Sequence, residues 1–75
     1  MLPITSIQEC NSAAQAIGNS DITASETNNI VLPEGCYEKD GGLYLSKNPI
    51  NKGRGATSTR HLICKTTGYF HLWYL

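Results

Sequence analysis

Long apolar runs are missing from this chain of 75 residues, and no stretch approaches the roughly 20 apolar residues that a membrane-spanning helix needs. Its first residues, Met1 to Ile4, have neither the basic start nor the apolar run of a secretory signal peptide. We therefore expect no transmembrane segment. The chain is extracellular if a signal peptide is missing from this sequence, and cytoplasmic otherwise.

Acidic residues are absent after Asp40. Residues 1–40 hold six acids against Lys39 alone, for a charge of −5, whereas residues 41–75 hold five bases and no acid, for +5. The formal net charge is therefore zero. We expect the two halves to attract each other in the folded chain, and we expect no nucleic-acid partner.

Paired C-x-x-C motifs, typical of zinc sites, are also lacking, although the chain has three cysteines. A domain this short buries only about 60% of the surface that its unfolded form exposes, so its core is marginal and a covalent link would matter. The wide spacing of Cys10, Cys36 and Cys64 favours one disulfide plus a third thiol. All three pairings stay open.

A helix is predicted to begin at Ser6, because Ser6-Ile7-Gln8-Glu9 matches a capping box in which Ser6 and Glu9 cap each other. Apolar residues then recur at spacings of three and four. They form a stripe of Ile7, Cys10, Ala14 and Ile17, widened by Ala13 and Ala16. Gly18-Asn19 is suited to a left-handed C-cap and should end the helix.

A hairpin is predicted around Asp40-Gly41-Gly42, between the apolar runs Gly35-Cys36-Tyr37 and Leu43-Tyr44-Leu45. A third run, His61 to Cys64, supplies another strand. Alternation places Leu43 and Leu45 on one face and Tyr44 on the other, and it places Leu62 and Cys64 together on the face that we take to meet the helix if the sulfur atoms converge. If Cys36 lies on that face as well, the three sulfur atoms come within bridging reach.

The fold class is therefore α+β, with one N-terminal helix packed on a small antiparallel sheet of about three strands and a disulfide. Residues 1–5 form a lead, and residues 6–65 form one module in which residues 20–29 and 46–59 are loops. Residues 66–75 form an aromatic tail outside this module. The tail either adds to a sheet edge or partner surface, or is an incidental disordered terminus.

Metal binding and catalysis find little support. His61 and Cys64, with Cys36, Cys10 or His71, could supply metal ligands, but a spacing of three on a strand points His61 and Cys64 to opposite faces. A cysteine nucleophile beside His61 meets the composition alone. Glu34, Glu38 and Asp40 flank a turn as surface charges. We expect no catalytic residue, metal or cofactor.

Two surfaces are candidates for contact with a partner, either a protein or a carbohydrate. Tyr37 and Tyr44, with Tyr69, could form an aromatic platform, or could simply cover the sheet. Lys52 and Arg54, in a basic loop with Lys47 and Arg60, could bind an anionic group, or could be solvated.

The chain resembles a short cysteine-containing module found in predicted proteins of dinoflagellates, diatoms and other protist algae. The matching segments are Glu9-Cys10, Ala13-Ala14, Ile17-Gly18, Asp21 to Ala24, Leu32 to Tyr37, Leu43 to Leu45 and Arg60 to Lys65. The resemblance implies a helix followed by a small sheet, disulfide bonding, a secreted or surface-exposed context, and no established activity.

Three functional hypotheses follow. The first is a non-enzymatic, disulfide-linked module for extracellular or surface recognition, with Tyr37 and Tyr44 on its contact surface. The second is an intracellular protein with reduced cysteines whose basic loop binds an anionic partner. The third is a fragment of a larger precursor with no function alone. The oligomeric state does not follow from the sequence.

Overall fold

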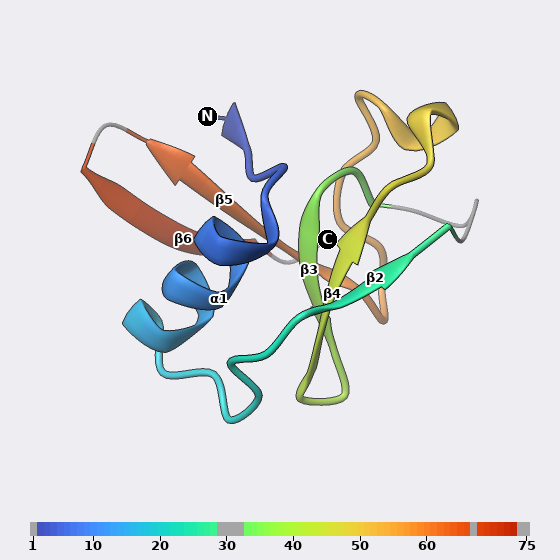
Figure 1. The fold of residues 1–75 in the computed structure, drawn as a ribbon. Coiled ribbons are helices and arrows are strands. Elements are labelled where there is room, and N and C mark those ends of the chain that lie inside the picture. The colour runs from blue at the N-terminus through green and yellow to red at the C-terminus, as the bar shows by residue number, and fades with distance from the viewer. Residues whose placement is uncertain (1, 29–32, 67, 74–75) are drawn as a thin grey trace.

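The computed structural model describes residues 2–28, 33–66 and 68–73, in which one helix packs on one face of a mixed sheet (Figure 1). This arrangement confirms the α+β fold class. Its elements in chain order are β1 (Leu2–Pro3), α1 (Ile7–Ala16), β2 (Ser25–Thr27), β3 (Cys36–Lys39), β4 (Gly42–Ser46), the short 3₁₀ helix η1 (Pro49–Asn51), β5 (His61–Thr66) and β6 (Tyr69–Trp73).

Helix α1 has the predicted ends. The Ser6 Oγ accepts a hydrogen bond of 3.1 Å from the Glu9 amide, which satisfies one of the unpaired amides at the start of the helix. At the other end Gly18 has φ of 79°, and its amide donates to the Gln15 carbonyl while that of Asn19 donates to the Ala14 carbonyl. These two bonds form a Schellman motif, which glycine permits because it tolerates positive φ.

The reciprocal half of the capping box is wrong. The Glu9 carboxylate instead accepts from the Lys65 Nζ, at 2.8 and 3.0 Å, and so ties the first turn of α1 to β5. Ala16 is exposed and does not widen the buried stripe, whereas Cys10, Ala13 and Ala14 are fully buried.

The hairpin of β3 and β4 is confirmed, and Figure 1 shows it as the green and yellow pair. Lys39 pairs with Gly42, which leaves Asp40 and Gly41 as a two-residue loop with φ of 52° and 84°. Positive φ at both positions defines a type I′ turn, whose twist matches that of the flanking strands.

Strand β5 is the centre of the sheet. Residues 62–66 of β5 pair with β6 on one edge, while β3 and β1 pair with successive parts of the other edge. Beyond β3 lies β4, and β2 then pairs with β4 in parallel. The described residues thus form six strands in a mixed sheet, more than the three or so antiparallel strands predicted.

Two of the extra strands lie where the sequence predicted other structure. Strand β2 lies within the predicted loop of residues 20–29. Strand β6 continues the sheet past Lys65, the predicted end of the module. Thr66 pairs with Tyr69, and Gly68 has φ of 83°, as a tight turn requires. The apolar run Ile30 to Leu32 lies outside the described residues.

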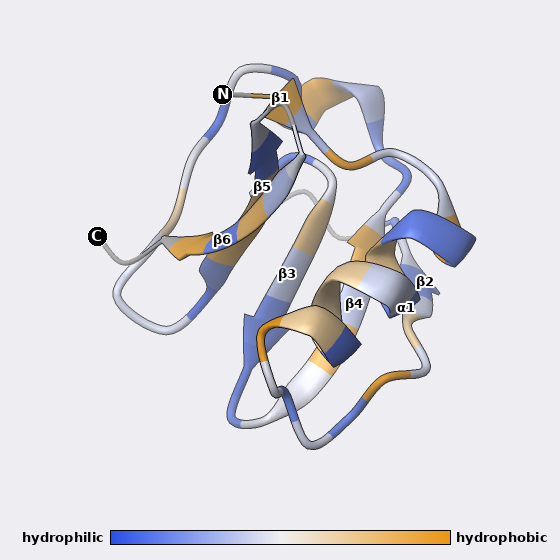
Figure 2. Ribbon diagram, turned by 90° about the vertical axis from the view of Figure 1, so that its left-hand side faces the viewer, coloured by the Kyte–Doolittle hydropathy of each residue, from blue (hydrophilic) through white to orange (hydrophobic). Residues whose placement is uncertain are grey.

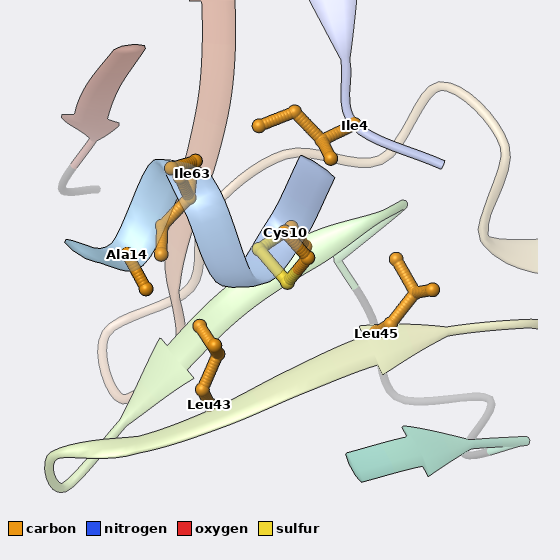
Figure 3. Close-up of a cluster of buried hydrophobic side chains, with 8 residues drawn as sticks. Ile4, Cys10, Ala14, Leu43, Leu45 and Ile63 are labelled. Carbon is orange, nitrogen blue, oxygen red and sulfur yellow. A yellow bond between two sulfur atoms is a disulfide. The ribbon is translucent and has the colours of Figure 1, made fainter. Parts of the chain in front are cut away.

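The core fills the space between α1 and the sheet. Figure 2 shows α1 lying over β3 and β4, and Figure 3 shows the side chains that meet there. Cys10 of α1 and Cys36 of β3 are joined by a disulfide, with a Cα–Cα distance of 5.5 Å, at the middle of this cluster. Its buried members are Ile4, Cys10, Ala13, Ala14, Cys36, Leu43, Leu45 and Ile63.

The predicted phase of β5 is wrong, and so is the meeting of three sulfur atoms. Ile63 packs in the core and Lys65 reaches Glu9 of α1, so the odd-numbered residues of β5 face the helix. Leu62 and Cys64 therefore point to the opposite face. Cys64 is buried there and takes no part in the disulfide.

The predicted loop after β4 is held by side chains. Asn48 caps η1, since its Oδ1 accepts from the Ile50 amide at 3.1 Å. Asn51 is almost fully buried and its Nδ2 donates to the Ser46 Oγ at 2.9 Å. Glu34 accepts from the Gly53 amide at 2.9 Å, which fixes the loop against the segment before β3.

Candidate functional site

Two stacked tyrosines mark the face of the sheet opposite α1, here called the outer face. Tyr37 of β3 and Tyr44 of β4 are directly opposed, and their ring centroids lie 5.3 Å apart with an interplanar angle of 23°. Because neighbouring residues on a strand point to opposite faces, this stacking follows from the burial of Cys36, Leu43 and Leu45 on the helix side. Tyr37 is 4% exposed, so the accessible aromatic surface belongs to Tyr44.

The Tyr44 ring packs against the backbone of Gly42, which has no side chain to obstruct it. A β-carbon on Gly42 would lie 3.0 Å from the Tyr44 hydroxyl and 3.1 Å from its Cε2. The ring therefore lies over the backbone of its own strand, where any larger residue at position 42 would crowd it. This contact orients Tyr44 on the outer face.

A hollow of about 340 Å³ opens beside the stacked pair. We call it the tyrosine hollow. It combines aromatic, hydroxyl and charged groups from three strands and the segment before β5, and its lining residues are Ser25, Glu26, Thr27, Tyr37, Lys39, Tyr44 and Arg60. Its volume lies at the small end of the range of ligand pockets, roughly 300 to 1,000 Å³.

The cations of this hollow are not neutralised within the described chain. Glu26, which lines the hollow, forms an exposed ion pair of 3.4 Å with Lys47, which is not among the lining residues. Neither Lys39 nor Arg60 forms an ion pair with any residue that the structure describes. The Arg60 Nε is buried and has no hydrogen-bond partner there. The hollow therefore carries positive charge that is available to a ligand.

Strand β2, which forms one wall of the hollow, is positioned by polar contacts just before it. The Asp21 carboxylate accepts from the amides of Thr23, at 2.9 Å, and Leu43, at 3.1 Å, and these two bonds lower the pKa of Asp21. The Asn11 Oδ1 of α1 accepts from the Ala24 amide at 2.7 Å. These bonds link the approach to β2 to both the helix and β4.

His61 and Glu38 form an ion pair outside the tyrosine hollow. The Nδ1 of His61 lies 2.7 Å from the Glu38 Oε1, and Oε2 of the same carboxylate accepts from the Gly41 amide at 2.6 Å. Burial raises the pKa of Glu38, but the Gly41 amide and His61 outweigh it, and the net pKa is lowered. The pair joins β5 to the turn between β3 and β4.

The arrangement gives His61 and Cys64 no common site. His61 contacts Glu38 and has the same parity on β5 as Ile63, which faces the helix, whereas Cys64 lies on the opposite face. No group of three or more His, Cys, Asp and Glu side chains among the described residues is placed to hold a metal ion.

The other predicted contact residues divide between two places. Tyr37 and Tyr44 line the hollow, whereas Lys52 and Arg54 are exposed on the loop after η1 and do not. Sequence reasoning missed the other lining residues of this surface, which are Ser25, Glu26, Thr27, Lys39 and Arg60. The alternation of β4 signals Tyr44, but nothing local indicates which distant residues surround it.

No described helix has the length and apolar character that crossing a bilayer requires. Comparison with known proteins found no matching family model, no matching curated protein and no matching solved structure.

Proposed function

We propose that this chain is a non-enzymatic, disulfide-linked recognition module that acts outside the cell or at its surface. Its contact surface is the tyrosine hollow on the outer face of the sheet. The observation that carries this proposal is the stacked pair of Tyr37 and Tyr44 beside two cations without ion-pair partners in the described chain. Aromatic rings with a few convergent polar groups are typical of binding sites.

The disulfide supports the location. Cys10 and Cys36 both have no exposed surface, and their bond joins α1 to the sheet at the centre of the core. Disulfides form and persist in oxidising compartments, and small secreted domains use them to compensate for a small core. A buried structural disulfide therefore favours an extracellular setting.

The site geometry favours binding over catalysis. Cys64 and His61 lie on opposite faces of β5. His71 of β6 is paired with Cys64, but its Nε2 lies 3.1 Å from the Thr66 Oγ1, and neither residue is among the described residues that line the hollow. The hollow holds tyrosines, hydroxyls and charges, and the part of the chain that the structure describes contributes no histidine or cysteine to its lining. These features suit recognition of a ligand by shape and charge.

A binding panel tests this function. We would apply the oxidised chain, and the variants Tyr44→Ser and Tyr69→Ser, to an array of neutral and acidic oligosaccharides and short peptides. Tyr69 is a matched control because its side chain is 71% exposed on β6 and does not line the hollow. We expect the wild type and Tyr69→Ser to bind the same members of the array, and Tyr44→Ser to lose them.

A second variant guards against simple unfolding. Gly42→Ala keeps both tyrosines but crowds the Tyr44 ring, so it should weaken binding while the circular dichroism spectrum of the chain is retained. Equal binding by all four proteins, or binding by none, would contradict the proposal. Undiminished folding and binding in full reducing conditions would favour the intracellular alternative.

A further inference from the structure

We propose that the tyrosine hollow binds an acidic saccharide, in which a sugar ring carries a carboxylate, and that Arg60 and Lys39 receive this carboxylate. The inference rests on the proposed function, because it names the ligand class for the same surface. Three observations carry it: the distribution of ion pairs, the state of the Arg60 guanidinium, and the kinds of side chain around Tyr44.

The ion pairs leave these two cations for a ligand. Most carboxylates of the described chain are already engaged: Glu9 with Lys65, Glu26 with Lys47, Glu38 with His61, Glu34 with the Gly53 amide, and Asp21 with two amides. Lys39 and Arg60 share one hollow and have no such partner among the described residues. Charge complementarity therefore selects an anionic ligand.

The Arg60 side chain favours a carboxylate. Its Nε is buried and lacks an acceptor, and a buried donor without a partner is destabilising. The Nε–H of a guanidinium lies parallel to one terminal N–H, and the two match the two oxygens of a carboxylate. Because the Nε has almost no exposed surface in the unliganded chain, the Arg60 side chain turns toward the hollow when a carboxylate binds along this edge and supplies the missing acceptor.

The remaining lining favours a sugar over a peptide side chain. The Tyr44 ring offers an apolar face, and Ser25 carries a hydroxyl that can donate and accept. No aliphatic side chain is among the described residues that line the hollow, so an apolar peptide residue finds little to contact there. A sugar ring has both a flat apolar side and many hydroxyls.

Titration with matched ligands tests the inference. We would follow the backbone amide signals of the oxidised chain by nuclear magnetic resonance while adding trigalacturonate or its fully methyl-esterified form. The ester keeps the ring and removes the charge. We expect trigalacturonate to shift the signals of Tyr37, Lys39, Tyr44 and Arg60, and the ester to bind at least about tenfold more weakly, as the loss of a charged hydrogen bond predicts.

Variants identify the residues. Arg60→Gln should weaken trigalacturonate binding about tenfold, and Arg60→Lys should restore it only in part because lysine keeps the charge without the fork. Arg54→Gln is the matched control, since it removes the same charge from an exposed loop outside the hollow. Lys39→Gln provides a second test should Arg60→Gln prove unstable.

Several results would overturn the inference. Equal binding of acid and ester at the hollow would overturn it while leaving the proposed contact surface intact. Equal binding of a triglutamate peptide would show that charge alone is read. Absence of any signal shift, or equal losses in Arg60→Gln and Arg54→Gln, would also reject it, whereas failure of the Tyr44→Ser comparison on the array would reject the proposed function itself.

Discussion

The backbone of Gly35 lies against that of Ile4, so closely that a β-carbon on Gly35 would come within 2.6 Å of the Ile4 carbonyl oxygen. Gly35 also has φ of 77°. This contact brings the start of the chain against the start of β3, and it places the Ile4 side chain in the core with no exposed surface. Position 35 therefore has two independent reasons to be glycine.

The first prediction concerns this contact. Gly35→Ala should destabilise the chain by roughly 3 kcal/mol, because it adds a backbone collision to the cost of a left-handed conformation. Gly53→Ala is the matched control, since Gly53 has φ of 82° but nothing lies within 4 Å of an added β-carbon. It should cost only about 1 kcal/mol. Urea unfolding measures both, and equal losses would contradict the close packing.

A second prediction separates the Ser6 cap at the start of α1 from the ion pair of Glu9 with Lys65. Ser6→Ala should lower the free energy of unfolding by about 1 kcal/mol through loss of the cap. Glu9→Gln should cost less, about 0.5 kcal/mol, because it weakens only a half-exposed ion pair with Lys65. In the Lys65→Met background, Glu9→Gln should have no further effect. An undiminished effect there would mean that Glu9 acts through Ser6.

The third prediction concerns the covalent link. The Cys10–Cys36 bond joins residues 26 positions apart, and closing a loop of this length stabilises the folded chain by about 3 kcal/mol in the chain-entropy treatment. The double variant Cys10→Ala/Cys36→Ala should lose about this much stability, which is a large share for so small a domain. Cys64→Ala should lose clearly less. A reversed order would contradict the assigned pairing.

The fourth prediction is a pH dependence. The pKa of Glu38 in the folded chain is lowered from its ordinary value of 4.5, so its contribution to stability is complete above that value. The contribution declines as the pH falls, because the unfolded chain binds the proton first, and it is lost below the folded-state pKa. Glu38→Gln should therefore flatten the acid side of a plot of unfolding free energy against pH. Glu26→Gln, at an exposed ion pair, should leave the plot unchanged.

Local sequence signals predicted the elements that depend on near neighbours. Ser6, with the apolar stripe behind it, placed the start of α1, and Gly18 placed its end. Asp40-Gly41 placed the hairpin, since few other residue pairs accept positive φ at both positions. The sides of Leu43, Tyr44 and Leu45 followed from strict alternation.

The errors arise where several local solutions are equally good. His61-Leu62-Ile63-Cys64 has apolar residues on both sides of the strand, so its alternation does not show which side faces the helix. The prediction placed Cys64 on that side, whereas the structure places Ile63 there, one residue away. Strand β2, with only Ser25-Glu26-Thr27, has no apolar pattern and forms because β4 offers an edge. The hollow was not predictable because Arg60 and Ser25 meet the tyrosines only through these long-range pairings.

The most direct test of the fold and its setting is disulfide mapping of the unreduced protein, alkylated under denaturing conditions. Cleavage after Lys and Arg gives the peptide 1–39, which holds both Cys10 and Cys36, and the peptide 61–65, which holds Cys64. We predict that peptide 1–39 is short of two hydrogen atoms and unalkylated, while peptide 61–65 carries one alkyl group. Two alkyl groups on peptide 1–39, or a disulfide that includes Cys64, would contradict both the pairing and the extracellular module built on it.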